Sequence, residues 1–530
     1  MCYMGLLKYI HRFKERNIMY YIHKEIKNPL KDGIELAEEL QNNIEDPSLM
    51  ILVTSITKKE KIEELLTGLK QNLRLDNLIG CTTAGEFSEN YETKQGALLL
   101  AFNKSCKVAV GRMPQGTPAR ENGSLLAEDI NQKLTEKYPK IDMHEKFLGF
   151  VFHDWNDDDE NEVIEGLSSK LSFPIIGGTA ADSMEFKNMY QIYQDKVLSN
   201  HTVFGAVSPK KKFNILYGHG YEPTEYYARV TKTDGYIIEE LDGKPAYEVY
   251  SKMVSNILNV PLETINKYIP NENSNLDFTI LYPPGIQDIY GHHKLLFIKK
   301  IENNNIIVSQ RIKEGTFLTL MKTSVQKTKE SLIHEIQKKT RGFKLPFTFI
   351  IECVARKIIK NPKAFEHPFV SEDFEKWISP NENILNEKEV FKTCIGFNSY
   401  GESIVNGVMR FHNALTFTGV SFDLESTSKI NWKSSLKYFE FSEEELKIIL
   451  ELIDSRLSAK DLLKRLDLSQ TKLYATLNDL EDRNIIKSQG KNPKKYYIEN
   501  ILKVLKDVSD RLDCQYQYKK EKRNKLLSKF

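Results

Sequence analysis

The alternation of strand-like and helix-like segments constrains the fold of this chain more than any other feature of its sequence. A strand pattern that begins at Met19 is followed by a helix pattern over residues 31–42, a buried strand pattern over 49–55 and a second helix pattern over 58–73. Apolar residues in the second helix recur every three or four positions, which is the period of a helix with one buried face. This repeated alternation predicts an α/β fold with mixed sheets.

Turns made of small residues interrupt the alternation. One covers residues 79–87 (Ile-Gly-Cys-Thr-Thr-Ala-Gly-Glu-Phe) and a second covers 176–182 (Ile-Gly-Gly-Thr-Ala-Ala-Asp). A backbone without bulky side chains can approach a ligand closely, so the first of these turns is a candidate edge of a binding site. Strand patterns at 96–102 and 108–113 follow the first turn and predict a hairpin-like pair.

The chain has 530 residues, a length that corresponds to about three domains. A polar, Ser- and Lys-rich segment predicts a linker between an α/β body and a helical C-terminal part. The first residues are either a short basic amphipathic helix for a membrane surface or an incidental extension before an alternative start at Met19. The predicted parts are an extension at 1–18, two α/β halves at 19–235 and 236–424, a linker at 425–440, a helical domain at 441–498 and a C-terminal helix at 499–530.

The helical domain has the pattern of a winged helix-turn-helix. Helix patterns cover 458–466 and 470–483 and are separated by a three-residue turn, and each is preceded by a serine that can cap its free amides. A β-hairpin pattern over 485–498 provides the wing. In the C-terminal helix that follows, apolar residues at alternating four- and three-residue spacing predict a seam for a homodimer.

Charge separates this domain from the rest of the chain. The whole chain has a formal net charge of +2, but residues from 441 onward hold 20 Lys and Arg against 15 Asp and Glu, while the remainder holds 55 against 58. A basic domain beside a mildly acidic body indicates double-stranded DNA as a partner. With Leu473, Leu477 and Leu480 facing the core, the residues expected to contact DNA are Gln470, Thr471, Lys472, Tyr474 and Asn478 on the second helix and Lys491, Lys494 and Lys495 on the wing.

Cysteine spacing and hydropathy exclude several classes of protein. The six cysteines are scattered and form no Cys-x-x-Cys pair, so neither a zinc ribbon nor a disulfide scaffold is predicted. No apolar run reaches the roughly 18 residues that a membrane span needs. We therefore expect a cytoplasmic protein without a membrane span, metal site or cofactor.

Two family resemblances follow from these motifs. Residues 458–497 resemble the winged helix of the archaeal TrmB-like sugar-responsive regulators, in Leu-Ser-Gln-Thr-Lys-Leu-Tyr and Gly-Lys-Asn-Pro-Lys-Lys-Tyr. Residues from about 20 to 420 resemble the FIST sensory family, through the turns at 79–86 and 177–182, Leu-Asp-Gly-Lys-Pro-Ala at 241–246, Cys-Val-Ala-Arg at 353–356, and Gly-Phe-Asn-Ser-Tyr-Gly-Glu at 396–402 with Phe-His-Asn at 411–413. The FIST resemblance implies a ligand-sensing module, with small molecules such as amino acids as the expected ligands.

An amino-acid-like ligand needs a cation or amides for its carboxylate and an acid for its ammonium group. We expect Arg356 to clamp the carboxylate, and Glu86, Asp182 or Glu402 to hold the ammonium. Neutral hydrogen bonds and pocket walls complete the site. The predicted ligand-binding residues are Thr83, Gly85, Glu86, Gly178, Thr179, Asp182, Arg356, Ser399, Tyr400, Gly401, Glu402, His412 and Asn413.

The leading hypothesis is therefore a non-enzymatic regulator in which a two-part α/β sensor binds a small molecule and a winged helix binds DNA. Two alternatives remain. One is a cysteine-dependent enzyme with Cys81 or Cys353 as nucleophile and His219 or His412 as base. The other is a signalling adaptor whose winged helix mediates protein binding or dimerisation.

Overall fold

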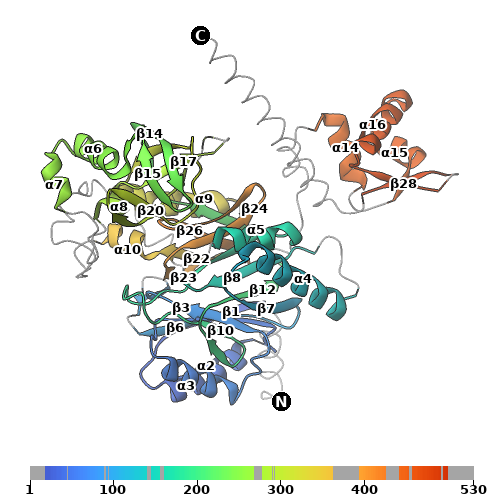
Figure 1. Cartoon of the computed structure of the whole chain (residues 1–530). Coiled ribbons are helices and arrows are strands. Elements are labelled where there is room, and N and C mark those ends of the chain that lie inside the picture. Colours follow the sequence, from blue (N-terminus) through green and yellow to red (C-terminus); the bar gives the residue numbers. More distant parts are fainter. Residues whose placement is uncertain are drawn as a thin grey trace, which may run out of the picture. The chain divides into compact units, whose positions relative to one another are not determined.

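The computed structural model describes most of the chain. The described residues are 18–44, 46–88, 91–93, 95–139, 145–155, 160–267, 277–288, 291, 293–361, 393–424, 441–452, 456–490 and 493–498. They form two compact units (Figure 1). The predicted extension at 1–18, linker at 425–440 and C-terminal helix with its dimer seam lie outside the described residues.

The core of the first unit is one strand–helix module that occurs three times along the chain. The first copy comprises β1 (Met19–Glu25), α2 (Pro29–Asn43), β2 (Leu49–Thr54), α3 (Lys59–Lys70), β3 (Leu78–Thr82), the short hairpin β4 (Glu86–Ser88) and β5 (Tyr91–Glu92), and β6 (Gly96–Phe102). The second comprises β7 (Val108–Pro114), α4 (Ala119–Lys137), β8 (Leu148–His153), α5 (Glu160–Lys170), β9 (Ile175–Thr179), the hairpin β10 (Gln191–Tyr193) and β11 (Lys196–Leu198), and β12 (His201–Val207).

The third copy contains a long insertion after its first strand. It comprises β13 (Lys212–Gly218), α9 (Val325–Thr340), β22 (Pro346–Cys353), α10 (Val354–Lys360), β23 (Cys394–Ser399), the hairpin β24 (Glu402–Asn406) and β25 (Met409–Asn413), and β26 (Phe417–Asp423). The inserted β subdomain comprises β14 (Glu222–Asp234), β15 (Ile237–Leu241), β16 (Lys244–Pro245), α6 (Ala246–Leu258), α7 (Leu262–Asn266), α8 (Asp277–Leu281), β17 (Pro284–Gln287), β18 (His293–Leu295), β19 (Ile298–Glu302), β20 (Asn305–Val308) and β21 (Phe317–Lys322). Its strands form a separate sheet.

Each module forms a sheet of the same topology, and its hairpin pairs with the sheet of another module. In all three sheets two strands run parallel (β2 with β3, β8 with β9, β22 with β23), and the last strand of the module lies antiparallel on the other side. The hairpin β4–β5 extends the sheet of β23, β10–β11 extends that of β3, and β24–β25 extends that of β9. The three six-stranded sheets therefore interlock.

A glycine at the third position of β3, β9 and β23 permits this close packing. A Cβ atom at Gly80, Gly177 or Gly396 would lie 1.7, 1.9 or 2.1 Å from a carbonyl oxygen of the neighbouring parallel strand. Any larger residue would push the two strands apart, because backbone atoms cannot yield as a flexible side chain can. The same Ile-Gly pair in all three strands is thus a structural requirement of the module.

The inner faces of the three sheets meet in one apolar core. Phe102 of β6 contacts Phe150 of β8 and Phe422 of β26, with ring centroids 6.3 and 6.2 Å apart, and Phe150 contacts Phe349 of β22 at 5.9 Å. The helices lie on the outer faces, where α2 and α3 pack together on the first sheet and α4 packs on α5 (Figure 1).

The predicted α/β fold with mixed sheets is confirmed, but the predicted hairpin of 96–102 with 108–113 is wrong. Both segments are strands, yet β6 pairs with β1 and β2, whereas β7 pairs with β12. The two strands belong to successive modules, and each pairs with strands of its own module.

The second unit has the predicted helix-turn-helix and wing. It comprises α14 (Glu443–Leu452), β27 (Leu457–Ser458), α15 (Ala459–Arg465), α16 (Gln470–Asp482), β28 (Lys487–Gln489) and β29 (Lys495–Tyr497). Ser458 and Asp461 form a capping box on α15, and the Ser469 side chain caps α16. Leu473, Leu477 and Leu480 are fully buried, which fixes α16 to the core by one face.

Candidate sensor site and DNA-binding surface

The crossing from β23 to β24 carries the polar residues of the candidate sensor site. At Gly401 the chain leaves the third sheet and joins β9, where the Thr179 amide donates to the Gly401 carbonyl at 2.8 Å. A Cβ atom on Gly401 would lie 2.3 Å from the His412 ring, so only glycine fits between the two strands. The backbone of the crossing is therefore fixed by its neighbours, and this fixes the positions from which its side chains project.

Glu402 is the first residue after the crossing and is completely buried. The Ser399 hydroxyl donates to one carboxyl oxygen at 2.7 Å, and the amide and hydroxyl of Thr416 donate to the other at 3.2 and 2.7 Å. Burial raises the pKa of Glu402 well above its usual value despite these hydrogen bonds. Burial therefore disfavours the charged form of this carboxyl group, which makes it a poor counter-ion for an ammonium.

Two buried histidines connect this crossing to the second module. The His412 ring nitrogens lie 2.8 Å from the Ser403 hydroxyl and 3.2 Å from the Thr179 hydroxyl. Ser403 also lies 3.1 Å from Nε2 of His153, whose Nδ1 faces Thr202 at 3.1 Å. Burial lowers the pKa of His153 to about 3 and holds that of His412 well below its usual value, so both rings are neutral.

Asn413 follows His412 and differs from every other polar residue at the crossing. Its side chain is 2% exposed, yet neither amide atom has a hydrogen-bond partner within the described part of the chain. The buried Tyr217 hydroxyl is a neighbour of this amide, but the two form no hydrogen bond of ordinary geometry. Buried polar groups are usually satisfied, so an unpaired amide beside an unpaired hydroxyl marks a place where a polar partner can bind.

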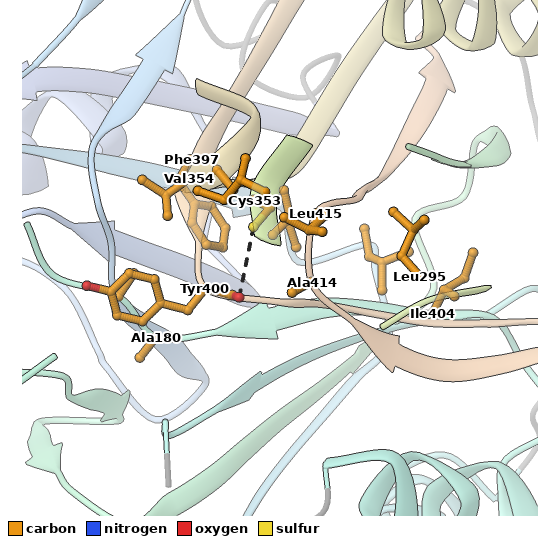
Figure 2. Close-up of a cluster of buried hydrophobic side chains, with 14 of the residues drawn as sticks. Ala180, Leu295, Cys353, Val354, Phe397, Tyr400, Ile404, Ala414 and Leu415 are labelled. Atoms are coloured by element: carbon orange, nitrogen blue, oxygen red, sulfur yellow. Dashed lines mark hydrogen bonds between the residues drawn. The ribbon is translucent and has the colours of Figure 1, made fainter. Parts of the chain in front are cut away.

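An apolar cavity of about 30 Å³ lies beside Tyr400, where the second module, the third module and the inserted subdomain meet. Figure 2 shows Tyr400 with the nearby side chains of Cys353, Ala414 and Leu415. The Tyr400 ring stacks on Phe186 with centroids 4.4 Å apart and contacts Trp155 edge-on at 5.4 Å. The lining residues are Trp155, Met184, Phe186, Ile280, Phe297, Cys353, Val354, Ala355, Tyr400, Ala414 and Leu415.

Asp182 anchors one wall of this cavity. Its carboxylate accepts hydrogen bonds from the backbone amides of residues 185–188 and from the Tyr400 hydroxyl. Burial alone would raise the pKa of Asp182, but the hydrogen bonds from Tyr400 and the loop amides hold it below its usual value. Asp182 thus remains ionised while its acceptor positions are occupied by protein donors.

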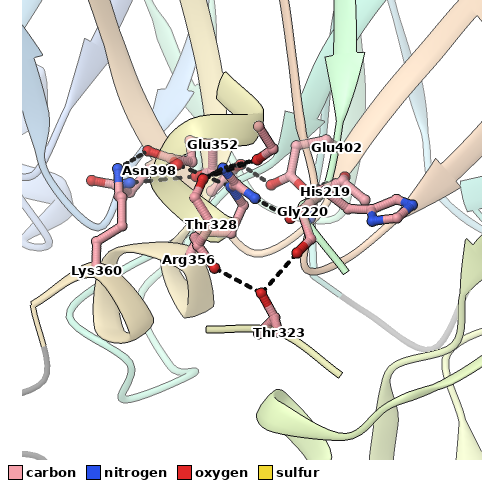
Figure 3. A network of polar contacts seen from close by, with 12 residues as sticks. His219, Gly220, Thr323, Thr328, Glu352, Arg356, Lys360, Asn398 and Glu402 are labelled. Carbon is pink, nitrogen blue, oxygen red and sulfur yellow. Dashed lines mark hydrogen bonds and ion pairs between the residues drawn. The ribbon is translucent and has the colours of Figure 1, made fainter. Parts of the chain in front are cut away.

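Arg356 lies in a buried network that adjoins Glu402, because the Ser399 hydroxyl contacts both the Glu352 carbonyl at 3.4 Å and the Glu402 carboxyl group (Figure 3). Its guanidinium pairs with Glu352 at 3.0 Å, donates to the Thr328 carbonyl at 2.7 Å and also donates to the His219 carbonyl. Lys360 pairs with the other oxygen of Glu352 at 2.6 Å. Burial acts to raise the pKa of Glu352, but the two cations hold it below its usual value. This network joins α10 to α9 and to the end of β13.

The crossing from β3 to β4 repeats the arrangement around a second buried acid. Glu86 accepts hydrogen bonds from the hydroxyls of Ser55 and Thr93, each at 2.9 Å, and from the Thr83 hydroxyl. Burial raises the pKa of Glu86 to about 7. The backbone amide of Ala84 donates to the Asn398 carbonyl at 2.9 Å, which connects the two crossings.

The structure thus distributes the predicted ligand-binding residues over three places. Around the β23–β24 crossing lie Gly178, Thr179, Asp182, Ser399, Tyr400, Gly401, Glu402, His412 and Asn413. Around the β3–β4 crossing lie Thr83, Gly85 and Glu86, and Arg356 lies in the network of Glu352, which Ser399 connects to Glu402. A clamp of Arg356 on a ligand carboxylate stays a prediction and would require exchange of its present partners.

Sequence reasoning missed the aromatic walls Trp155 and Phe186, the Tyr217 hydroxyl and the buried Thr416. Only the recurring Ile-Gly pair gave a signal, because aligning the three copies would have placed Glu86 and Glu402 at equivalent positions. Trp155 and Phe186 each lie more than 200 positions before Tyr400 in the sequence, so no local pattern links them to it.

The cysteines proposed for an enzyme are poorly placed for nucleophilic chemistry. Burial raises the pKa of the Cys81 and Cys353 thiols, so neither is a thiolate near neutral pH. The Cys353 thiol faces the Tyr400 carbonyl at 3.9 Å, and both ring nitrogens of His412 bind hydroxyl groups. Among the described residues no cluster of three or more metal-ligating side chains occurs.

The exposed face of α16 carries the residues predicted to contact DNA. Gln470, Thr471, Lys472, Tyr474 and Asn478 are all exposed, as are Lys494 and Lys495 on the wing. Lys491 lies outside the described residues. Two of the cations are in surface ion pairs, Lys472 with Glu444 at 2.5 Å and Lys494 with Glu481 at 2.8 Å. Exposed pairs of this kind are weak and can open when a phosphate competes.

The comparisons with known proteins identify both parts of the chain. Residues 48–244 match the FIST N domain, residues 246–404 match the FIST C domain, and residues 436–501 match the family described as "Sugar-specific transcriptional regulator TrmB". The chain therefore belongs to the FIST-domain proteins and joins FIST sensor domains to a TrmB-like transcription-regulator domain. Both resemblances read from the sequence motifs are confirmed.

The same architecture extends along a whole relative. "Uncharacterized protein MJ1623" of Methanocaldococcus jannaschii is 44% identical over 512 residues, which cover 96% of this chain and 99% of the relative. In the part of the chain that the structure describes, no helix is long and apolar enough to cross a membrane.

Proposed function

We propose that this protein is a one-component transcriptional regulator that senses a small molecule through its FIST domains and binds double-stranded DNA through its winged helix. The exposed polar face of α16, held by three buried leucines on the opposite face, is the observation that carries this proposal. A helix presented in this way can enter the major groove, and its Gln, Thr, Lys and Asn side chains can bond base edges and phosphates.

The proposed regulator acts as a homodimer in cytoplasm, and the ligand shifts its affinity for DNA. Coupling requires that the ligand bind two arrangements of the protein with different affinity, since equal affinity shifts no equilibrium. The description of the TrmB family names sugars, whereas the FIST resemblance implies amino acids. We expect the FIST domains to determine which ligand binds, because the TrmB match covers only the winged-helix segment of this chain.

A gel-shift titration with the chain's own promoter DNA, repeated at several salt concentrations, tests the DNA-binding part. We expect binding that weakens steeply with salt, because phosphate contacts release counterions. Lys472→Ala should weaken binding to all sequences and lower the salt slope by about 1. Asn478→Ala should reduce the preference for promoter over a random duplex of equal length.

Lys460→Ala is the matched control, because Lys460 is also an exposed lysine of this domain but lies on α15. It removes the same charge and should leave specific binding largely unchanged. Absence of salt-sensitive DNA binding in the wild-type chain would refute the regulator and favour the adaptor, in which the winged helix binds protein.

A further inference from the structure

Glu481 has an unfavourable electrostatic position in the proposed DNA-binding domain. It lies in the last turn of α16, and this turn contains no basic residue. The C-terminal end of a helix carries a partial negative charge, so a carboxylate there is destabilising. A carboxylate on a helix that contacts DNA also repels the phosphates. Electrostatics alone therefore does not explain an acid at this position.

The contacts of Glu481 explain it, because they join α16 to both strands of the wing. One carboxyl oxygen accepts a hydrogen bond from the Ser488 hydroxyl on β28, and the other pairs at 2.8 Å with the ammonium group of Lys494, which directly precedes β29. Hydrogen bonds from Lys494 and Ser488 hold the pKa of Glu481 below its usual value, so the group is a carboxylate near pH 7. A hydrogen bond to a charged acceptor is stronger than one between neutral groups.

The wing itself is a small sheet. β28 and β29 have three residues each, and β29 also pairs with the two residues of β27. Strands this short are marginally stable without further contacts. The Arg456 guanidinium, directly before β27, donates to Gln489 at 3.1 Å and so braces the sheet within itself. Glu481 braces the sheet against the helix.

We infer that Glu481 is a positioning residue for DNA binding, whose carboxylate holds the wing at a fixed place beside α16 so that Lys495 and the exposed face of α16 contact one duplex. This inference rests on the DNA-binding role in the proposed function. A wing that is already fixed loses less conformational freedom on binding, which raises affinity. When a phosphate draws Lys494 away, the hydrogen bond from Ser488 remains.

Two substitutions in the full chain separate the position of this side chain from its charge. Glu481→Gln and Glu481→Ala remove the same charge, but only glutamine keeps an acceptor for the Ser488 hydroxyl. In gel-shift titrations with promoter DNA we expect the glutamine variant to bind at least as tightly as the wild type, and the alanine variant to bind roughly fivefold more weakly than the glutamine variant. Equal affinity of the two variants would overturn the inference. Alanine favours helix formation, so a loss of α16 would not explain weaker binding.

Asp482 provides the matched control. It is the next residue of α16, is exposed, and makes no hydrogen bond or ion pair with the described residues of the wing. Asp482→Asn and Asp482→Ala should therefore bind DNA with equal affinity, because both remove only a charge. In a Ser488→Ala background the two Glu481 variants should also become equal. An advantage of glutamine that persists without the Ser488 hydroxyl would contradict the proposed contact.

Hydrogen exchange in the absence of DNA tests the same contact independently. The amides of β28 and β29 should exchange roughly fivefold faster in Glu481→Ala than in Glu481→Gln, because the wing opens more often when it is not held. The amides of α16 should stay protected in both variants, which shows that the domain is folded. Equal exchange of the wing amides in the two variants would overturn the inference.

Failure of this inference and failure of the regulator are distinguishable. If the wild-type chain binds DNA in a salt-sensitive manner but the two Glu481 variants bind equally, the positioning role is wrong and the regulator stands. If the wild-type chain does not bind DNA, the regulator is wrong, and the exchange rates still show whether Glu481 holds the wing.

Discussion

The β3–β4 crossing and the β23–β24 crossing occupy equivalent places in two copies of one module, and both are polar, but only the second contains an unpaired buried side chain among the described residues. At both, a strand leaves its sheet, a hydroxyl three residues earlier donates to a buried glutamate, and the glutamate begins the exchanged hairpin. Burial raises the pKa of both glutamates. Both crossings therefore close a sheet over a buried glutamate whose pKa is raised.

The difference lies in the residue opposite each glutamate. Thr93 stands opposite Glu86, donates to it at 2.9 Å and bonds the His23 ring at 3.0 Å. Asn413 stands opposite Glu402, and its amide has no partner among the described residues. The first crossing is complete as a structural joint, whereas the second retains free hydrogen-bonding capacity beside an aromatic cavity.

The largest effect is expected where the crossings are alike. Gly80→Ala, Gly177→Ala and Gly396→Ala each place a methyl group against a backbone carbonyl, so each should destabilise the first unit by more than about 4 kcal/mol. The fraction of folded protein, followed by urea unfolding with circular dichroism, should fall equally in all three. A tolerated substitution at one position would show that its module is not equivalent to the others. Gly243→Ala is a control with no atom near its Cβ direction, where only the left-handed φ of 72° should cost about 1–2 kcal/mol.

A second effect separates the loss of the acid from the loss of its charge. Glu86→Ala and Glu402→Ala remove a buried acceptor that two or three hydroxyls share, so each should lower the free energy of unfolding by about 3 kcal/mol. The corresponding glutamine variants retain the shape and should cost about 1 kcal/mol, because burial disfavours the charged form of both glutamates. Equal losses for alanine and glutamine would mean that the glutamates are ionised in the folded protein.

The sharpest test of the difference exchanges the opposite residues. Thr93→Val removes two hydrogen bonds and should cost about 1–2 kcal/mol, whereas Asn413→Leu removes none made within the described protein and should be neutral or stabilising by about 1 kcal/mol. Urea unfolding of the two variants beside the wild type measures both. If Asn413→Leu destabilises as much as Thr93→Val, the Asn413 amide is fully partnered in solution and the two crossings do not differ.

The smallest effect is a pH dependence at Glu86. The folded pKa of about 7 exceeds the usual value of 4.5, so the folded state binds the extra proton and this contribution to stability is lost as pH rises through 7. Between pH 6 and pH 8 it should fall by about 1 kcal/mol. The difference in unfolding free energy between wild type and Glu86→Gln isolates it, since the histidines contribute equally to both chains. A difference that does not change with pH would contradict the raised pKa of Glu86.

Local patterns determined the strands, the helices, the small-residue turns and the winged helix, because period, capping serines and glycines act over a few residues. They also indicated which face of α16 is exposed, since residues three and four apart share one side of a helix. The wrong hairpin at 96–113 shows the limit of prediction from local patterns, because a strand pattern does not specify the strand with which it pairs.

Only the tertiary structure decided which small-residue turns lie next to one another and how their side chains are partnered. The exchange of hairpins brings residues of the second module next to residues of the third, so Trp155, Phe186 and Tyr400 line one cavity although the sequence gives no sign of it. Tertiary structure also decided that the pKa of Glu402 is raised and that Arg356 is bound by Glu352, since burial and partners set the pKa of a side chain and the sequence specifies neither.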